Sequence, residues 1–153
     1  MRLLLSTLAL SSLLVPGLAA QDASTPAKLQ WGPAPPAFPK GAQMAVVSGN
    51  PGEAGMFTIQ LSMPAGYQIM PHWHPTDEQV LVISGTFLVG MGDGFNQKTM
   101  KSMAPGDSGS IPAKKNHYAM AKTATVVSVT AMGPFAMTYV NPKDDPRANK
   151  PMP

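Results

Sequence analysis

The sequence predicts an all-β fold, a small antiparallel β-barrel or jelly roll built as one domain. Short segments rich in β-branched and aromatic residues follow one another through most of the chain. Gly, Pro and Asn turns separate them at regular spacing. Only residues 95–103 could form a helical turn, and the APGD that follows ends it. A chain of 153 residues with many short strands and no internal repeat favours a closed barrel or a sandwich.

Each expected strand combines branched or aromatic side chains with a turn residue at its end. In chain order the expected strands are 44–48, 57–63, 68–74, 79–84, 86–91, 124–132 and 135–140. The junction ISGTF at 83–87 predicts a tight hairpin turn. Gly85 supplies the backbone angle that such a turn requires.

The first 20 residues have the features of a secretory signal peptide. Arg2 precedes an apolar run over 3–15, and the small residues Ala19 and Ala20 mark the expected cleavage point. A membrane anchor is the alternative, but the apolar run is shorter than the roughly 20 residues that a span needs. The protein is therefore expected to be periplasmic or secreted, and free of the membrane after cleavage.

The rest of the chain divides into three parts. Residues 21–43 form a Pro-rich arm, 44–140 the β-barrel, and 141–153 a C-terminal tail. Trp31 and Phe38 are the aromatic residues of the arm, and such residues usually hold an arm against the domain body. They are expected to cover a barrel end or a partner subunit.

Composition excludes several classes of function. Without residues 1–20 the chain has ten basic and eight acidic residues, a net charge of +2 with neutral histidines. This charge is too small and too scattered to indicate a nucleic-acid partner. The chain has no cysteine, so disulfides cannot stabilise it. It must fold on its apolar core, with a bound ion as a further source of stability.

The stretch MPHWHPTDE holds two of the chain's three histidines. Alternate residues of a strand share a face, so His72 and His74 point to one side and Trp73 to the other. The flanking prolines predict an edge-like segment that does not pair. A tight turn then returns Glu78 to the same inner face. Burying these groups without a cation would cost several kcal/mol, so this cluster predicts a metal site.

The spacing of these residues resembles the first motif of the cupin superfamily, Gly66-X5-His72-X-His74-X3-Glu78-X6-Gly85. Residues Gly106-X5-Pro112-X4-His117 resemble the second motif. The resemblance spans residues 44–140 and implies that His72, His74, Glu78 and His117 hold one divalent ion, whether Zn, Mn, Fe, Ni or Cu. Such an ion would keep free positions for water, substrate or dioxygen.

The second motif departs from the cupin pattern at two positions. Lys114 stands where the family usually has glycine, the residue that adopts a left-handed turn conformation most easily. Asn116, in the same turn, can also tolerate that conformation. Ala121 stands where the family usually has asparagine, which removes a polar group from the wall of the site. Neither position is a ligand.

Cupins include enzymes, storage proteins and sensors, so fold alone does not decide the function. With all three histidines as ligands, no imidazole remains as a general base. The favoured interpretation is metal-centred, dioxygenase-like chemistry on a small apolar or phenolic molecule, with Glu78 as the catalytic proton acceptor. The alternative is a non-catalytic ligand-binding or sensory barrel. The remaining acid or base candidates are Glu53, Tyr67, Tyr118, Tyr139, Lys114 and Lys115.

Two further features have more than one interpretation. The chain has 12 methionines, and Met70 and Met120 could approach an ion and favour copper, but methionine more often fills irregular cores. The pair Lys114-Lys115 could attract an anionic substrate, but such a pair is more often a solvated turn.

Apolar residues at Met70, Val80, Val82 and Met120 are expected beside the ion. Cupins commonly dimerise through N-terminal arms, so the resemblance also admits a homodimer.

Overall fold

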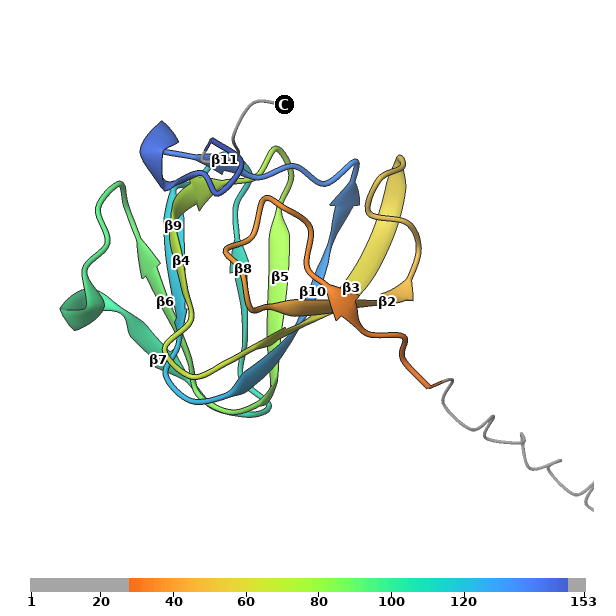
Figure 1. The fold of residues 1–153 in the computed structure, drawn as a ribbon, viewed down its shortest axis with the longest axis horizontal. Helices are drawn as coiled ribbons and strands as arrows, with labels where there is room; N and C mark the ends of the chain where they lie inside the picture. The colour runs from red at the N-terminus through yellow and green to blue at the C-terminus, as the bar shows by residue number, and fades with distance from the viewer. Residues whose placement is uncertain (1–27, 149–153) are drawn as a thin grey trace, which may run out of the picture.

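The computed structural model describes residues 28–148 and shows an all-β domain of two antiparallel sheets (Figure 1). The predicted fold class is confirmed. The expected signal peptide lies outside the described residues, as does the end of the tail. Among residues 28–148, no helix is long and apolar enough to span a membrane.

The six-stranded sheet is the larger of the two. In spatial order, the six-stranded sheet contains β1 (Gly32–Pro33), β2 (Gln43–Ser48), β3 (Gly55–Met63), β10 (Thr125–Gly133), β5 (Glu78–Ser84) and β8 (Ser108–Ile111). The five-stranded sheet contains β11 (Thr138–Tyr139), β4 (Gln68–Trp73), β9 (His117–Ala121), β6 (Phe87–Met91) and β7 (Lys101–Met103). Two short 3₁₀ helices, η1 (Gln97–Thr99) and η2 (Pro142–Asp144), lie outside the sheets.

The core lies between the two sheets. Side chains on β3 and β10 alternate between buried and partly exposed, as period-2 strands with one face toward a core do. Phe57, Ile59 and Leu61 of β3 point inward, and Val127 and Val129 of β10 pack beside them. The sequence alternation that predicted these strands therefore also fixes which face is buried.

Strand β4 is not an edge, contrary to the expectation from its prolines. It lies between β11 and β9, and it pairs with both. The register with β9 shifts between Ile69 and His72, which places Pro71 at the irregularity, where its missing N–H costs no ladder bond. The Pro71 carbonyl still accepts a bond from Val140 N at 2.9 Å.

Several elements differ from the sequence prediction. Strands β7 and β8 were not expected, since they are short and include Lys, Ser and Gly residues. The short strand β9 was not expected either. Residues 135–140 form a strand only at Thr138–Tyr139. In the Pro-rich segment, Gly32–Pro33 pairs with β2 at the edge of the sheet, where proline is tolerated.

Two tyrosines hold the loop between β1 and β2 across one end of the barrel. Tyr67 Oη donates to the Pro39 carbonyl, and Tyr139 Oη donates to the Ala37 carbonyl at 2.8 Å. These carbonyls flank Phe38, whose side chain is buried in the core. Phe38 therefore covers a barrel end as expected, while Trp31 stays exposed.

Gly90 in β6 is required by the ring of Tyr118, which sits directly opposite it on β9. A Cβ at Gly90 would collide with ring atoms of Tyr118, and this tyrosine is 1% exposed and cannot swing away. Gly90→Ala should lower the free energy of unfolding by about 1–3 kcal/mol, as overpacking does. Urea denaturation measures this change.

Gly109→Ala in β8 is the matched control. Its Cβ would meet Met103 Cε at 3.8 Å, an ordinary contact. This variant should stay within about 0.5 kcal/mol of the parent. Equal effects of the two substitutions would contradict the packing role given to Gly90.

Candidate metal centre

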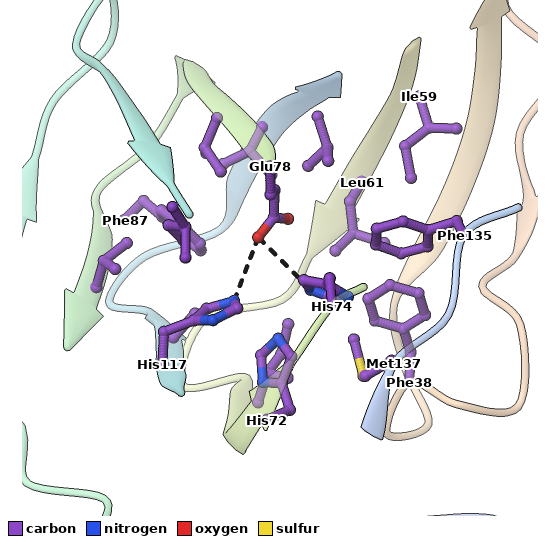
Figure 2. Close-up of a pocket in the computed structure, with 17 residues that line it drawn as sticks. Phe38, Ile59, Leu61, His72, His74, Glu78, Phe87, His117, Phe135 and Met137 are labelled. Carbon is purple, nitrogen blue, oxygen red and sulfur yellow. Dashed lines mark ion pairs between the residues drawn. The ribbon is translucent and has the colours of Figure 1, made fainter. Parts of the chain in front are cut away.

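The four residues expected to bind metal lie together between the two sheets (Figure 2). His72 and His117 are direct cross-strand partners on β4 and β9 of the five-stranded sheet. Glu78 is the first residue of β5 in the six-stranded sheet. His74 lies just after β4, in the connection between the sheets. All four are buried.

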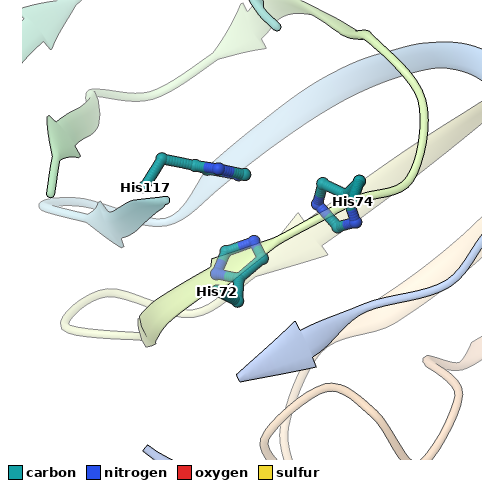
Figure 3. A group of neighbouring side chains, drawn as sticks. All are labelled: His72, His74 and His117. Atoms are coloured by element: carbon teal, nitrogen blue, oxygen red, sulfur yellow. The ribbon is translucent and has the colours of Figure 1, made fainter. Parts of the chain in front are cut away.

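The three imidazoles face one another (Figure 3). One ring nitrogen from each of His72, His74 and His117 lies within 4.8 Å of the others, a group that could hold a metal ion. Glu78 Oε2 lies 3.2 Å from His117 Nε2 and 3.5 Å from His74 Nε2. The structure therefore brings together every side chain that the two motifs singled out.

Backbone carbonyls set the protonation of all three rings. His72 Nδ1 lies 2.8 Å from the Met70 carbonyl, His74 Nδ1 2.8 Å from the Ala136 carbonyl, and His117 Nδ1 2.9 Å from the Lys115 carbonyl. A carbonyl oxygen only accepts, so each Nδ1 carries the proton and each Nε2 has a free lone pair. Three Nε2 atoms and a carboxylate oxygen thus converge as acceptors, which is the arrangement that a cation satisfies.

The pKa values of these groups favour the metal-binding protonation states. Burial, together with the neighbouring imidazoles of His117 and His74, lowers the pKa of His72 to about 3. Burial also lowers the pKa of His74. For Glu78 burial alone would raise the pKa, but the adjacent His117 and the other nearby imidazoles outweigh it and lower the pKa. Neutral imidazoles and an ionised carboxylate are the forms that bind metal.

The cavity around the cluster is small and apolar. Its volume is about 30 Å³, room for no more than a few water molecules. His72, His74, Glu78 and His117 are the only polar residues among the seventeen that line it. Phe135 stacks on His74 with ring centroids 4.5 Å apart. Phe38 and Met137 extend the apolar wall beyond it (Figure 2).

The expected apolar neighbours of the ion are only partly correct. Val80 lines the cavity, and Val82 is buried in the core without lining it. Met70 and Met120 do not line it either. The register shift in β4 reverses the alternation, so Ile69 faces inward in place of Met70. Met120 lies one residue out of phase with His117 on β9.

The loop before His117 also differs from expectation. Lys114, not Asn116, adopts the left-handed conformation, with φ of 59°. Its N–H donates to the His74 carbonyl at 2.7 Å, which ties this loop to the segment that carries His74. Lys114 therefore takes the conformation usual for glycine. Neither Lys114 nor Lys115 lines the cavity.

The other acid or base candidates do not line the cavity. Glu53 and the lysines are exposed. Tyr118 bonds Thr99 Oγ1 and the Asn96 carbonyl, away from the cavity. Burial raises the pKa of Tyr67 and Tyr139 well above the usual value, so their hydroxyls remain donors to the loop that carries Phe38.

Phe135, Ala136 and Met137 are parts of the site that were not expected from the sequence. They were expected to form a strand, and no motif marks them. They contribute a ring on His74, the carbonyl that orients it, and part of the apolar wall. Arg147 holds this segment by donating to the Met137 carbonyl at 2.9 Å.

The two-sheet barrel and the inward His and Glu cluster define a single-domain cupin. Residues 20–136 match the family model of the ChrR Cupin-like domain, and the chain belongs to that family. No match was found among curated proteins.

Solved structures share this fold. The polyketide cyclase RemF from Streptomyces resistomycificus is 15% identical, with a TM-score of 0.65 over 83% of this chain and 90% of its own. A candidate acetylacetone dioxygenase from Methylibium petroleiphilum is 21% identical, with a TM-score of 0.61 over 87% and 90%. The DMSP lyase DddQ from Ruegeria pomeroyi is 20% identical, with a TM-score of 0.57 over 72% and 60%. At such identities the likeness establishes the fold alone.

The lowered histidine pKa values predict that the metal-free protein is sensitive to acid. Unfolded histidines bind protons below about pH 6.5, while His72 in the folded protein does so only near pH 3. Stability is therefore complete above pH 6.5 and is lost as the pH falls through this window. The loss is about 1.4 kcal/mol per pH unit for each such histidine. Urea denaturation of chelator-treated protein at pH 7.5, 6 and 5 measures it.

His72→Gln removes one titrating group, so the free energy of unfolding of this variant should fall less steeply as the pH is lowered. A free energy of unfolding that does not change between pH 7.5 and 5 would contradict the assignment of neutral, buried imidazoles.

Proposed function

We propose that the protein is an exported metal-binding cupin that acts on a small apolar or phenolic molecule by metal-centred, dioxygenase-like chemistry. His72, His74, Glu78 and His117 hold the ion, and Glu78 is also the catalytic proton acceptor. One observation carries the proposal: four acceptor atoms converge in a cavity whose other lining residues are all apolar.

The residues present fit a divalent transition metal. Imidazole nitrogen suits Zn, Cu, Fe and Ni, and a carboxylate adds suitability for Mn. When bound, such an ion supplies Lewis acidity and free coordination positions for a small molecule. The carbonyls of Met70, Ala136 and Lys115 orient the three rings, as outer partners of metal-ligating histidines commonly do.

Glu78 has the properties of the proton acceptor in this site. The neighbouring imidazoles keep its carboxylate ionised, the form that accepts a proton. No other carboxylate, and no lysine or tyrosine, lines the cavity. A proton released from a bound phenol or an acidic C–H therefore has Glu78 as its nearest acceptor.

The lining residues favour a neutral substrate. An anionic substrate that keeps its charge away from the metal would need an arginine or lysine as its partner, and neither lines the cavity. Phe38, Phe135 and Met137 offer apolar contact on one side of the cluster (Figure 2). A small molecule that binds the ion through its own oxygens and places an apolar remainder against these side chains fits this lining best.

Substrate access would require the loop between β1 and β2 to move. The cavity of about 30 Å³ has room for no more than a few water molecules, and Phe38 closes one side of it. The bonds from Tyr67 and Tyr139 hold the loop at the carbonyls on either side of Phe38. Release of these two bonds would free Phe38 to leave the cavity.

The closed cavity also supports a second candidate function, a ligand-binding or sensory barrel without turnover. A site that closes tightly around one small ligand can report its presence through the loop. Both functions use the same metal ligands, and measurements of turnover separate them.

Export is part of the proposal and rests on the sequence of residues 1–20. A chain that is exported unfolded would acquire its ion outside the cytoplasm. There the general order of affinities of divalent metals for protein sites favours zinc or copper. N-terminal sequencing of protein from the exported fraction tests this, with cleavage expected after Ala19 or Ala20. An intact N-terminus in the cytoplasmic fraction would contradict it.

Glu78→Gln should abolish turnover while keeping the fold, because an amide cannot accept the proton. The assay is oxygen uptake on phenols and small diketones by protein loaded separately with Fe, Mn, Ni, Cu or Zn. Glu53→Gln is the matched control, since Glu53 is the chain's other glutamate and is exposed. It should leave turnover unchanged. Full turnover by Glu78→Gln would contradict the role of Glu78, and no turnover by the parent with any metal would favour the sensory barrel.

Removing the hydroxyls of Tyr67 and Tyr139 together should open the loop more often. Each hydrogen bond contributes about 1 kcal/mol, so loss of both, about 2 kcal/mol, should let the double variant to Phe exchange its ion with a chelator about thirtyfold faster. Loading and release should speed up alike, which leaves the dissociation constant unchanged. Stopped-flow chelation measures both rates.

Tyr118→Phe is the control for this pair. Tyr118 Oη bonds the loop at Asn96, away from the cavity, so its loss should not change exchange. Exchange rates of the double variant equal to those of the parent, or faster release without faster loading, would contradict the gating role of the two tyrosines.

A further inference from the structure

A second hollow lies at the open side of the barrel, between strands β7 and β8. Each of these strands is the last of its sheet, and the two do not pair with each other. Residues of both strands line the hollow, together with Val80 of β5 and with Val89 and Met91 of β6. Its volume is about 200 Å³, larger than that of the metal cavity. We call it the edge groove.

The floor of the edge groove is apolar and adjoins the metal cavity. Val80, Val89 and Ile111 line both spaces, so their side chains separate the two. Gly109 of β8 stands opposite Val80 and leaves its part of the floor without a side chain. A Cβ at this position would meet Met103 Cε at 3.8 Å, an ordinary contact. An apolar group that enters the groove therefore finds apolar partners on several sides.

Lys101 is the one charged residue among the nine that line the edge groove. It pairs with Val89 across β6 and β7, and it lies two residues before Met103, whose side chain is buried in the core. Alternate residues of a strand share a face, so Lys101 projects toward this same inner side, where the gap between the sheet edges leaves it exposed. Among residues 28–148, no carboxylate forms a salt bridge with Lys101. The groove therefore has a cation at its rim and no acidic residue in its lining.

We propose that the edge groove is a second ligand site, and that it binds a small carboxylate with an apolar tail. The ammonium of Lys101 pairs with the carboxylate through a charge-assisted hydrogen bond. The tail packs on Val80, Val89 and Ile111, and its removal from water favours binding. A neutral molecule of the same shape lacks the ion pair, and a cationic one meets Lys101 as a like charge.

The edge groove is separate from the candidate metal centre in chemistry as well as in position. The four candidate metal ligands do not line it, so a carboxylate bound there would not coordinate the ion. Carboxylates also bind divalent metals, and a probe carboxylate therefore has two places to bind. A readout specific to each place distinguishes them.

Methionine methyl groups provide that readout. Met91 and Met103 line the edge groove, whereas Met137 lines the metal cavity. We expect hexanoate, added to zinc-loaded protein with labelled methionine methyls, to shift the NMR signals of Met91 and Met103 in a saturable way and to leave Met137 unchanged. Hexanol and hexylammonium should each bind about threefold more weakly or worse. Acetate should give no saturable shift, because it has no tail.

Charge substitutions at the rim test the role of Lys101. Lys101→Gln should raise the dissociation constant of hexanoate about threefold, as the loss of one exposed ion pair does. Lys101→Glu should bind hexylammonium in preference to hexanoate. Lys98→Gln is the matched control, because Lys98 is exposed in η1 and does not line the groove. It should bind hexanoate as the parent does.

A side chain added to the floor should close the site. Gly109→Val places a β-branched residue in a strand, which strands accept, so this variant should keep the dispersed methyl spectrum of the parent while it loses the hexanoate shifts. No saturable shift in the parent, hexanoate shifts confined to Met137, or equal binding of hexanol and hexanoate would each overturn the proposal. Equal effects of Lys101→Gln and Lys98→Gln would also overturn it.

Discussion

The structure depends on one electrostatic constraint: four acceptor atoms face one another inside a β-barrel. Each histidine gives its Nδ1 proton to a backbone carbonyl, so each Nε2 must accept. The Glu78 carboxylate joins them at 3.2 and 3.5 Å from two of these nitrogens. Buried acceptors without a donor cost several kcal/mol. A divalent cation removes that cost, and the surrounding elements are arranged so that all four atoms can reach it.

The barrel creates this convergence from distant parts of the chain. Cross-strand pairing of β4 and β9 brings His72 beside His117, and β5 of the opposite sheet delivers Glu78. Lys114 fastens the loop of the second motif to His74. The apolar wall then excludes water, which strengthens every electrostatic interaction inside the cavity. The loop that carries Phe38 completes this exclusion, and two tyrosine hydroxyls hold it in place.

The sequence predicts the fold class and the histidine positions well, because both depend on local patterns. Alternating side chains identify β3 and β10, and the spacing of His72, His74 and Glu78 places them on one inner face. Features that depend on pairing between distant strands were not predictable. The register shift in β4 turns Met70 away from the cavity, and only the partner strand β9 reveals it. Phe135 and Met137 enter the site through tertiary packing and carry no local signal.

The most direct test of the central claim is X-ray absorption spectroscopy of the protein loaded with one equivalent of zinc or manganese. We expect a first shell with three imidazole nitrogens and one carboxylate oxygen at about 2.0–2.2 Å. The imidazole scattering should fall by two ligands in a His72→Ala, His74→Ala variant. A shell of water oxygens alone, or a spectrum unchanged in that variant, would contradict the claim that these residues hold the ion.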